Sequence, residues 1–236
     1  LLHAAVLVKI GVYIYARLFV NSFEIDKVFT VAVPIIAAVS ALVSAGVALR
    51  ENDIKRIIAY STISQLAFIL LGLSSGTEIG VLGGLLYILM HSVAKGGLFL
   101  CAGIVEHTLH TKDITKMGGL YKGMPLTALA FLFCAFSVMG IPPFGGFFAK
   151  YLVIDGIISA GNVGLGAVFI AGAVMTVLYL SRLFIKVFLG ETVSDAREAG
   201  SPVMVASVVV LAILSVALGI SIHWPSGFAS LIGGGI

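Results

Sequence analysis

The chain has 236 residues, of which 60% are hydrophobic and only 11% are charged, whereas a soluble domain is about 45–50% apolar and about 25% charged. This composition excludes an ordinary soluble domain, and the net charge of +3 is too small and too scattered to indicate nucleic-acid binding. Because an apolar helix of about 20 residues spans a bilayer, we expect an all-α, multi-pass membrane protein.

Apolar runs bounded by glycine, proline and charged residues predict about seven membrane spans. In chain order they cover about residues 1–20, 29–49, 54–74, 79–105, 124–158, 163–189 and 202–223. Together they form one membrane domain over residues 1–236. Since the chain opens inside the first apolar run, we expect it to be a fragment that lacks an N-terminal half.

The basic residues outside the spans predict the orientation. Nine of them lie in three alternating loops, which must fall on one face of the membrane, and only two, Arg17 and Lys27, lie in the opposite loops. Basic loops favour the cytoplasm. We therefore expect the protein to lie in the inner (cytoplasmic) membrane, with its N-terminus inside and its C-terminus outside.

Three lysines, Lys9, Lys95 and Lys150, fall inside the predicted spans. A lysine at the centre of a membrane helix costs about 2.5–3.5 kcal/mol, so each needs an explanation. Two explanations are structural: the amine reaches the membrane surface, or it pairs with one of the acids Glu106 and Asp155. The functional explanation is proton exchange along a hydrated path, because burial disfavours the charged form of an amine.

Other polar residues lie close to these lysines in the sequence. His91 is four residues before Lys95, on the same helix face, and histidine titrates near neutral pH; it is a candidate proton relay or a hydrogen-bonded structural group. The 54–74 span also carries four polar residues that line water or bond between helices: Ser61, Thr62, Ser64 and Gln65.

The fifth span contains a predicted helix break from Gly140 to Gly146, formed by Pro142, Pro143, Gly145 and Gly146. The prolines remove two backbone donors, and irregular backbone is tolerated at membrane depth only inside protein or beside a cavity. Broken helices of this kind mark ion sites in transporters, although a plain proline kink is an alternative. We expect Lys150 in the first turn after the break, where the helix dipole disfavours its charge.

The two cysteines, Cys101 and Cys134, lie in apolar runs and form no CxxC motif. Neither has a histidine at ligand spacing, so we expect no metal site, no cofactor and no catalytic residue in this chain. Buried cysteines commonly act as small hydrophobic residues.

Five stretches together resemble one family: the antiporter-like, ion-translocating membrane subunits shared by respiratory complex I, membrane-bound hydrogenases and Mrp-type Na+/H+ antiporters. They are residues 1–13 (LLHAAVLVKIGVY), 53–65 (DIKRIIAYSTISQ), 91–99 (HSVAKGGLF), 116–120 (KMGGL) and 140–150 (GIPPFGGFFAK). The family core has fourteen helices with two inverted repeats, and this chain resembles helices eight to fourteen.

The resemblance implies roles for the matched residues. Lys9 is similar to the central lysine of the family's eighth helix, and His3 to a histidine found there in some members. His91 and Lys95 correspond to the relay on the eleventh helix. Lys150 corresponds to the terminal ionisable group on the broken twelfth helix, which is a glutamate in other members.

The resemblance implies a proton-translocating subunit, with Na+ as a further candidate ion, inside a larger complex of the NADH:quinone oxidoreductase, hydrogenase or Mrp type. Its partners would be other membrane subunits, including homologous antiporter-like ones, which would carry any redox chemistry. The alternatives are a self-contained cation/proton exchanger and a scaffold subunit that conducts nothing.

Overall fold

The structure is a computed structural model that describes residues 7–20, 27–191 and 201–223. These ranges contain helices and no strand, which confirms the predicted all-α fold. In chain order the helices are α1 (Lys9–Tyr15), the π-helix η2 (Ala16–Val20), α2 (Lys27–Arg50), α3 (Ile54–Leu73), α4 (Glu78–Leu109), the 3-10 helix η3 (Ile114–Lys116), α5 (Pro125–Met139), α6 (Gly145–Ser159), α7 (Val163–Phe188) and α8 (Pro202–Ile220).

The helices follow the predicted spans closely. Five of them, α2, α3, α4, α7 and α8, are long and apolar enough to cross a membrane. The predicted break separates α5 from α6, but α6 already begins at Gly145, so Gly145 and Gly146 are helical and the break is shorter than expected. The protein is a multi-pass membrane protein; the count of seven spans stays a prediction.

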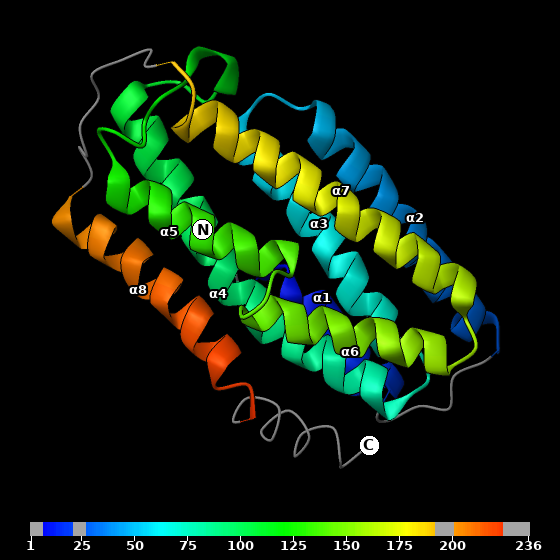
Figure 1. The fold of residues 1–236 in the computed structure, drawn as a ribbon. Helices are drawn as coiled ribbons and strands as arrows, with labels where there is room; N and C mark the ends of the chain where they lie inside the picture. Colours follow the sequence, from blue (N-terminus) through cyan, green and yellow to red (C-terminus); the bar gives the residue numbers. More distant parts are fainter. Residues whose placement is uncertain (1–6, 21–26, 192–200, 224–236) are drawn as a thin grey trace.

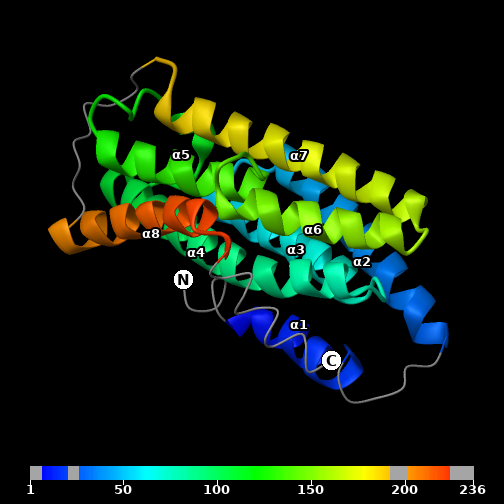
Figure 2. The same ribbon diagram turned by 60° about the horizontal axis from the view of Figure 1, so that its bottom comes forward.

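The long helix α4 lies at the centre of the bundle, in contact with α3, α5, α6 and α8. Helices α5 and α6 follow one another end to end along α4, with α8 on one side and α2 and α7 on the other (Figure 1). The short α1 lies on the face of the bundle opposite α7 and contacts α3 (Figure 2). Two of the neighbours of α4, helices α3 and α6, carry other buried polar residues of the predicted site.

Local sequence explains where the helices begin. The Asp53 side chain caps α3 by accepting hydrogen bonds from the backbone N–H groups of Lys55 and Arg56, as N-cap residues do. Thr77 caps α4 in the same way through the N–H of Gly80. Pro125 and Pro202 occupy the first turns of α5 and α8, where the missing N–H costs nothing.

The three basic loops meet at one end of the bundle. The Arg182 guanidinium on α7 donates to the carbonyl of Glu51 at 2.8 Å and to the side-chain oxygen of Asn52 at 2.7 Å. The N–H of Ile54 donates to the carbonyl of Lys112 at 2.9 Å. The described parts of these loops therefore lie at one end of the bundle, while the face and the side of the membrane that they occupy stay predictions.

Glycines allow two very close helix contacts. A Cβ atom at Gly83 of α4 would come within 2.7 Å of the Val153 nitrogen on α6. A Cβ atom at Gly219 of α8 would strike the carbonyl oxygen of Pro143 and lie 2.6 Å from the Gly145 nitrogen. Helix α8 therefore packs directly onto the break between α5 and α6.

Candidate functional site

Buried polar side chains gather inside the bundle on α1, α3, α4, α6 and α7. They include every predicted relay and water-lining residue in the described ranges: Lys9, Ser61, Ser64, Gln65, His91, Lys95 and Lys150. None of these is more than 6% exposed. His3 lies outside the described residues.

Lys95 on α4 is completely buried and its amine points at α3. It donates to the Ile58 carbonyl at 3.1 Å and to the Ser61 hydroxyl. Glu106, one of the two acids proposed as a structural partner, instead pairs with Lys55 and Lys112. Within the described ranges Lys95 forms no ion pair, so neutral oxygen atoms hold its amine.

Lys150 differs from the prediction in its place and in its helix-dipole environment. It is the sixth residue of α6, in the second turn rather than the first. Its amine reaches back across the break and donates to the carbonyls of Val138 at 2.7 Å and Met139 at 3.2 Å. These are the last residues of α5, where the negative end of the helix dipole stabilises a cation. The Phe68 ring faces the same amine, with its centroid 5.7 Å from the nitrogen.

His91 lies among the buried lysines. It is 1% exposed, and neither ring nitrogen has a hydrogen-bond partner in the described part of the chain. All three buried lysines, including Lys9, are near enough to act on it electrostatically. Buried polar groups without a protein partner are commonly satisfied by ordered water. The geometry is therefore compatible with a water-bridged position between the lysines.

The polar residues of α3 divide into two groups. Gln65 joins three helices: its amide nitrogen donates to Thr176 at 3.1 Å and to the Tyr179 hydroxyl at 3.3 Å, and its oxygen accepts from Tyr87. Ser61 contacts Lys95. The Ser64 hydroxyl is buried without a partner in the described residues. For Gln65, bonding between helices is thus the correct alternative.

Sequence reasoning missed Tyr87, Thr176 and Tyr179. Tyr87 lies four residues before His91, and the two rings are perpendicular with centroids 6.3 Å apart. Thr176 and Tyr179 are three residues apart on α7 and therefore share one face. Polar side chains at helical spacing inside an apolar run were the available signal.

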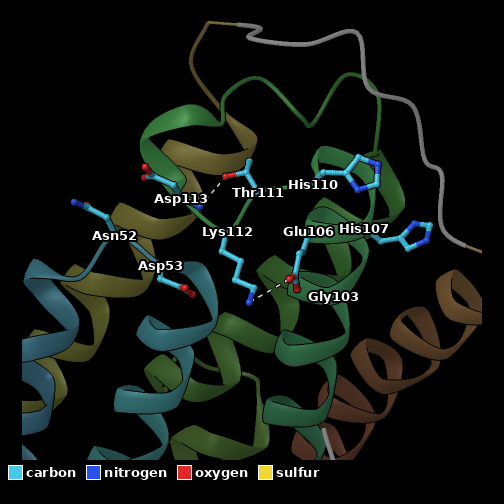
Figure 3. Close-up of a pocket in the computed structure, with 9 residues that line it drawn as sticks. All are labelled: Asn52, Asp53, Gly103, Glu106, His107, His110, Thr111, Lys112 and Asp113. Atoms are coloured by element: carbon cyan, nitrogen blue, oxygen red, sulfur yellow. Dashed lines mark hydrogen bonds and ion pairs between the residues drawn. The ribbon is translucent and has the colours of Figure 1, made fainter.

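An open pocket of about 870 Å³ lies at the end of the bundle that carries the basic loops. Figure 3 shows Glu106 and Lys112 facing each other across it, with His107 and His110 directed away from that pair. Hydrogen bonds from the hydroxyl and backbone N–H of Thr115 lower the pKa of Asp113, a further lining residue, and keep it ionised. No predicted site residue lines this pocket, so it is separate from the buried lysines.

No group of three or more histidine, cysteine or acidic side chains in the described part of the chain is arranged to hold a metal ion. Cys101 and Cys134 are both buried and are not joined by a disulfide.

Comparison with known proteins identifies relatives along nearly the whole chain. Residues 1–176 match the family described as NADH:quinone oxidoreductase/Mrp antiporter, TM. A Na(+)/H(+) antiporter subunit from Alkalihalophilus pseudofirmus is 34% identical over 92% of this chain and 45% of its own length. An NADH-quinone oxidoreductase subunit from Rhodobacter capsulatus is 31% identical over 98% of this chain and 45% of its own length. The chain thus spans about half the length of these curated relatives.

Solved structures show the same fold. A chain of the Mrp complex from Dietzia sp. DQ12-45-1b superposes with a TM-score of 0.87 at 26% identity, over 94% of this chain and 50% of that one. A chain of respiratory complex I from Thermus thermophilus with bound NADH gives 0.82 at 26% identity, over 97% and 50%. Taken with the match over residues 1–176, these likenesses show that the chain belongs to the NADH:quinone oxidoreductase/Mrp antiporter family of membrane proteins.

Proposed function

We propose that this chain moves protons across the membrane, as the C-terminal half of an antiporter-like subunit in a multi-subunit complex. The observation that carries the proposal is the placement of His91, with no hydrogen-bond partner in the described ranges, among three buried lysines. Within the described residues, Lys95 and Lys150 are held by neutral oxygen atoms and not by carboxylates. An amine held in this way can lose its proton without leaving an unpaired anion behind.

The proton path runs through Lys9, His91, Lys95 and Lys150, with water between them. Two like charges in a medium of low dielectric repel each other strongly. When one lysine loses its proton, the repulsion on its neighbours falls and the next site binds a proton more readily. Transfer at one site is therefore coupled to transfer at the next.

Substitution of Lys150 tests this function. Lys150→Met keeps the length of the side chain but cannot be protonated, so translocation should be abolished. Lys150→Glu should keep part of the activity, because a buried carboxyl group can also exchange protons near neutral pH and, when protonated, can donate to the Val138 carbonyl. Lys150→Arg should fail, because guanidinium stays protonated.

The measurement is proton pumping into vesicles that contain the assembled complex, with subunit content checked by co-purification. If Lys150 only stabilised the fold through its positive charge, the order of transport activity would be reversed, with arginine tolerated and glutamate damaging. Activity of Lys150→Arg equal to or above that of Lys150→Glu would contradict the relay.

Na+ is the second candidate ion, supported by the 34% identity to a protein named as part of a Na(+)/H(+) antiporter. In the same vesicles, proton efflux driven by an imposed Na+ gradient would support exchange. Efflux that is the same with Na+ and with choline would exclude Na+ as the coupled ion.

The same proposal includes the membrane and the partners. The chain would lie in the inner (cytoplasmic) membrane, with other membrane subunits beside it and the basic loops in the cytoplasm. Lys116→Cys should then react with an impermeant thiol reagent only from the cytoplasmic side, and Asn162→Cys only from outside. Labelling of both from one side would contradict this topology.

A further inference from the structure

Tyr87 and His91 lie one turn apart on a buried face of α4, and their rings pack together. The two ring planes are perpendicular and the centroids are 6.3 Å apart, within the range of about 4.5–7 Å in which aromatic pairs attract each other. Side chains on a helix lean toward its N-terminus. The imidazole of His91 therefore leans over the turn that carries Tyr87.

Hydrogen bonds do not orient the imidazole of His91. Its two nitrogens have no hydrogen-bond partner in the described part of the chain, and the side chain is buried. Among the described aromatic contacts, His91 takes part only in the contact with Tyr87. A functional histidine is commonly oriented by a hydrogen bond from one ring nitrogen to a carbonyl or carboxylate group. For His91, packing against the Tyr87 ring takes the place of that bond.

The Tyr87 ring is itself fixed at its far end. Its hydroxyl donates to the side-chain oxygen of Gln65 on α3. The amide nitrogen of Gln65 donates in turn to Thr176 at 3.1 Å and to the Tyr179 hydroxyl at 3.3 Å, both on α7. Three helices thus hold one tyrosine ring in place beside His91.

The hydroxyls on α7 determine which way the Gln65 amide points. The Thr176 hydroxyl donates to the Gly172 carbonyl at 2.8 Å, and the Tyr179 hydroxyl donates to Thr176 at 3.3 Å. Both oxygens therefore accept from the amide nitrogen, and the amide oxygen is left to face the Tyr87 hydroxyl. No member of this cluster is more than 1% exposed, so bulk water does not compete for these bonds.

We propose that Tyr87 is a positioning residue that holds the imidazole of His91 in one orientation, and that Gln65 acts through Tyr87 as its anchor. This inference rests on the proposed function, in which His91 passes protons between the buried lysines. A relay group must present its nitrogens in fixed directions, because small misplacements of reacting groups slow transfer strongly. The cluster on α3, α4 and α7 supplies that restraint without a charged partner.

The test begins with the rate of proton translocation per assembled complex in vesicles. Tyr87→Leu removes the ring and should slow translocation roughly 10-fold, and Tyr87→Phe, which keeps the ring but loses its anchor, roughly 3-fold. Both losses should stay below the effect of removing the imidazole itself. Tyr60→Phe on α3 loses the same hydroxyl from a tyrosine outside the cluster and should keep the original rate.

The decisive variants combine these changes with His91→Ala. If Tyr87 acts through His91, Tyr87→Leu should slow His91→Ala no further, because no imidazole remains to be held. A purely structural role would slow the double variant by about another 10-fold. If Tyr87→Leu does not assemble, Gln65→Met gives the same comparison with and without the imidazole, because it removes the anchor and leaves both rings in place.

Two results distinguish failure of the proposed function from failure of the positioning role. Unchanged transport in His91→Ala would contradict the proposed function itself. If His91→Ala slows transport but Tyr87→Leu slows it by the same factor with and without the imidazole, the positioning role alone is wrong. The same holds if Tyr87→Leu has the rate of Tyr60→Phe.

Discussion

The surroundings of Lys95 and Lys150 satisfy a buried amine by two different means. Lys95 is held by the Ser61 hydroxyl and one backbone carbonyl of α3. Lys150 is held by two backbone carbonyls at the end of α5 and by the face of Phe68. The first environment is made by residue identity and the second by the path of the backbone.

This difference decides how each site can be altered. A substitution at Ser61 on α3 can remove the hydroxyl that accepts from Lys95. The carbonyls around Lys150 are present whatever side chains α5 carries, so that site changes only when the break itself moves or when Phe68 is replaced. Point substitutions should therefore alter the Lys95 site directly through Ser61, whereas around Lys150 their effects should depend on whether the backbone shifts.

The largest effect is expected for loss of the buried amine of Lys95. Lys95→Met should abolish proton translocation in vesicles, because the Ser61 hydroxyl then has no charge to stabilise and the path loses a carrier. Lys112→Met removes an exposed lysine at the bundle end and should leave most of the transport. Equal transport by the two variants would show that burial of Lys95 has no functional meaning.

The next effect concerns the group between the two lysines. His91→Ala should slow translocation by about 100-fold, the size typical of losing a positioned acid–base group, with assembly intact on co-purification. His107→Ala, on the exposed end of the same helix, should leave the rate unchanged. Loss of assembly in His91→Ala, with normal transport by whatever complex remains, would identify the histidine as structural.

A smaller effect should come from moving the backbone that holds Lys150. Gly140 has φ +82°, and a Cβ atom there would lie 2.9 Å from Cδ of Lys150. Gly140→Ala should lower the free energy of unfolding by about 1–2 kcal/mol, seen as earlier thermal loss of the purified complex, and should reduce transport. In Gly103→Ala an added Cβ meets nothing within 4 Å. Equal thermal stability of the two variants would rule out strain at the break.

The smallest effect is expected for Phe68→Leu. A cation over an aromatic face gains about 0.5–2 kcal/mol, so losing the ring should move the alkaline limb of the pH–rate profile to lower pH by about half a unit. Phe131→Leu removes an equally buried ring that packs only on Phe184 and Phe188 among the described aromatic contacts. Identical pH–rate profiles for the two variants would show that the Phe68 ring does not stabilise the charge of Lys150 and that the α5 carbonyls alone do.

The sequence was sufficient to predict the helices, because apolar length and the proline and glycine positions determine them. The sequence predicts the ends of the helices less accurately. Helix α4 continues to Leu109, a full turn beyond the predicted boundary, because His110 adopts the left-handed conformation that ends it. The break ends at Phe144, because α6 already begins at Gly145. Close packing around Gly145 and Gly146 leaves no room for a larger side chain.

The site was predictable residue by residue but not in its contacts. Burial of Lys95, Lys150 and His91 follows from their place in apolar runs. The partners of Lys150 do not, because no pattern in the sequence shows that its side chain turns back across Gly140 toward α5. Tyr179 was missed for a related reason: its place in an apolar span does not show that its hydroxyl bonds to Gln65 and Thr176.

The contact of α8 with the break has a consequence for how the protein is made. The Pro143 carbonyl and the Gly145 backbone lie against Gly219, near the end of α8. During synthesis α5 and α6 leave the ribosome well before α8, so for that interval the irregular backbone has no α8 to separate it from lipid. Unsatisfied backbone groups are costly in hydrocarbon. The α5–α6 segment should therefore settle at its final depth only once α8 has been inserted, so that insertion of this helix completes the burial of the break.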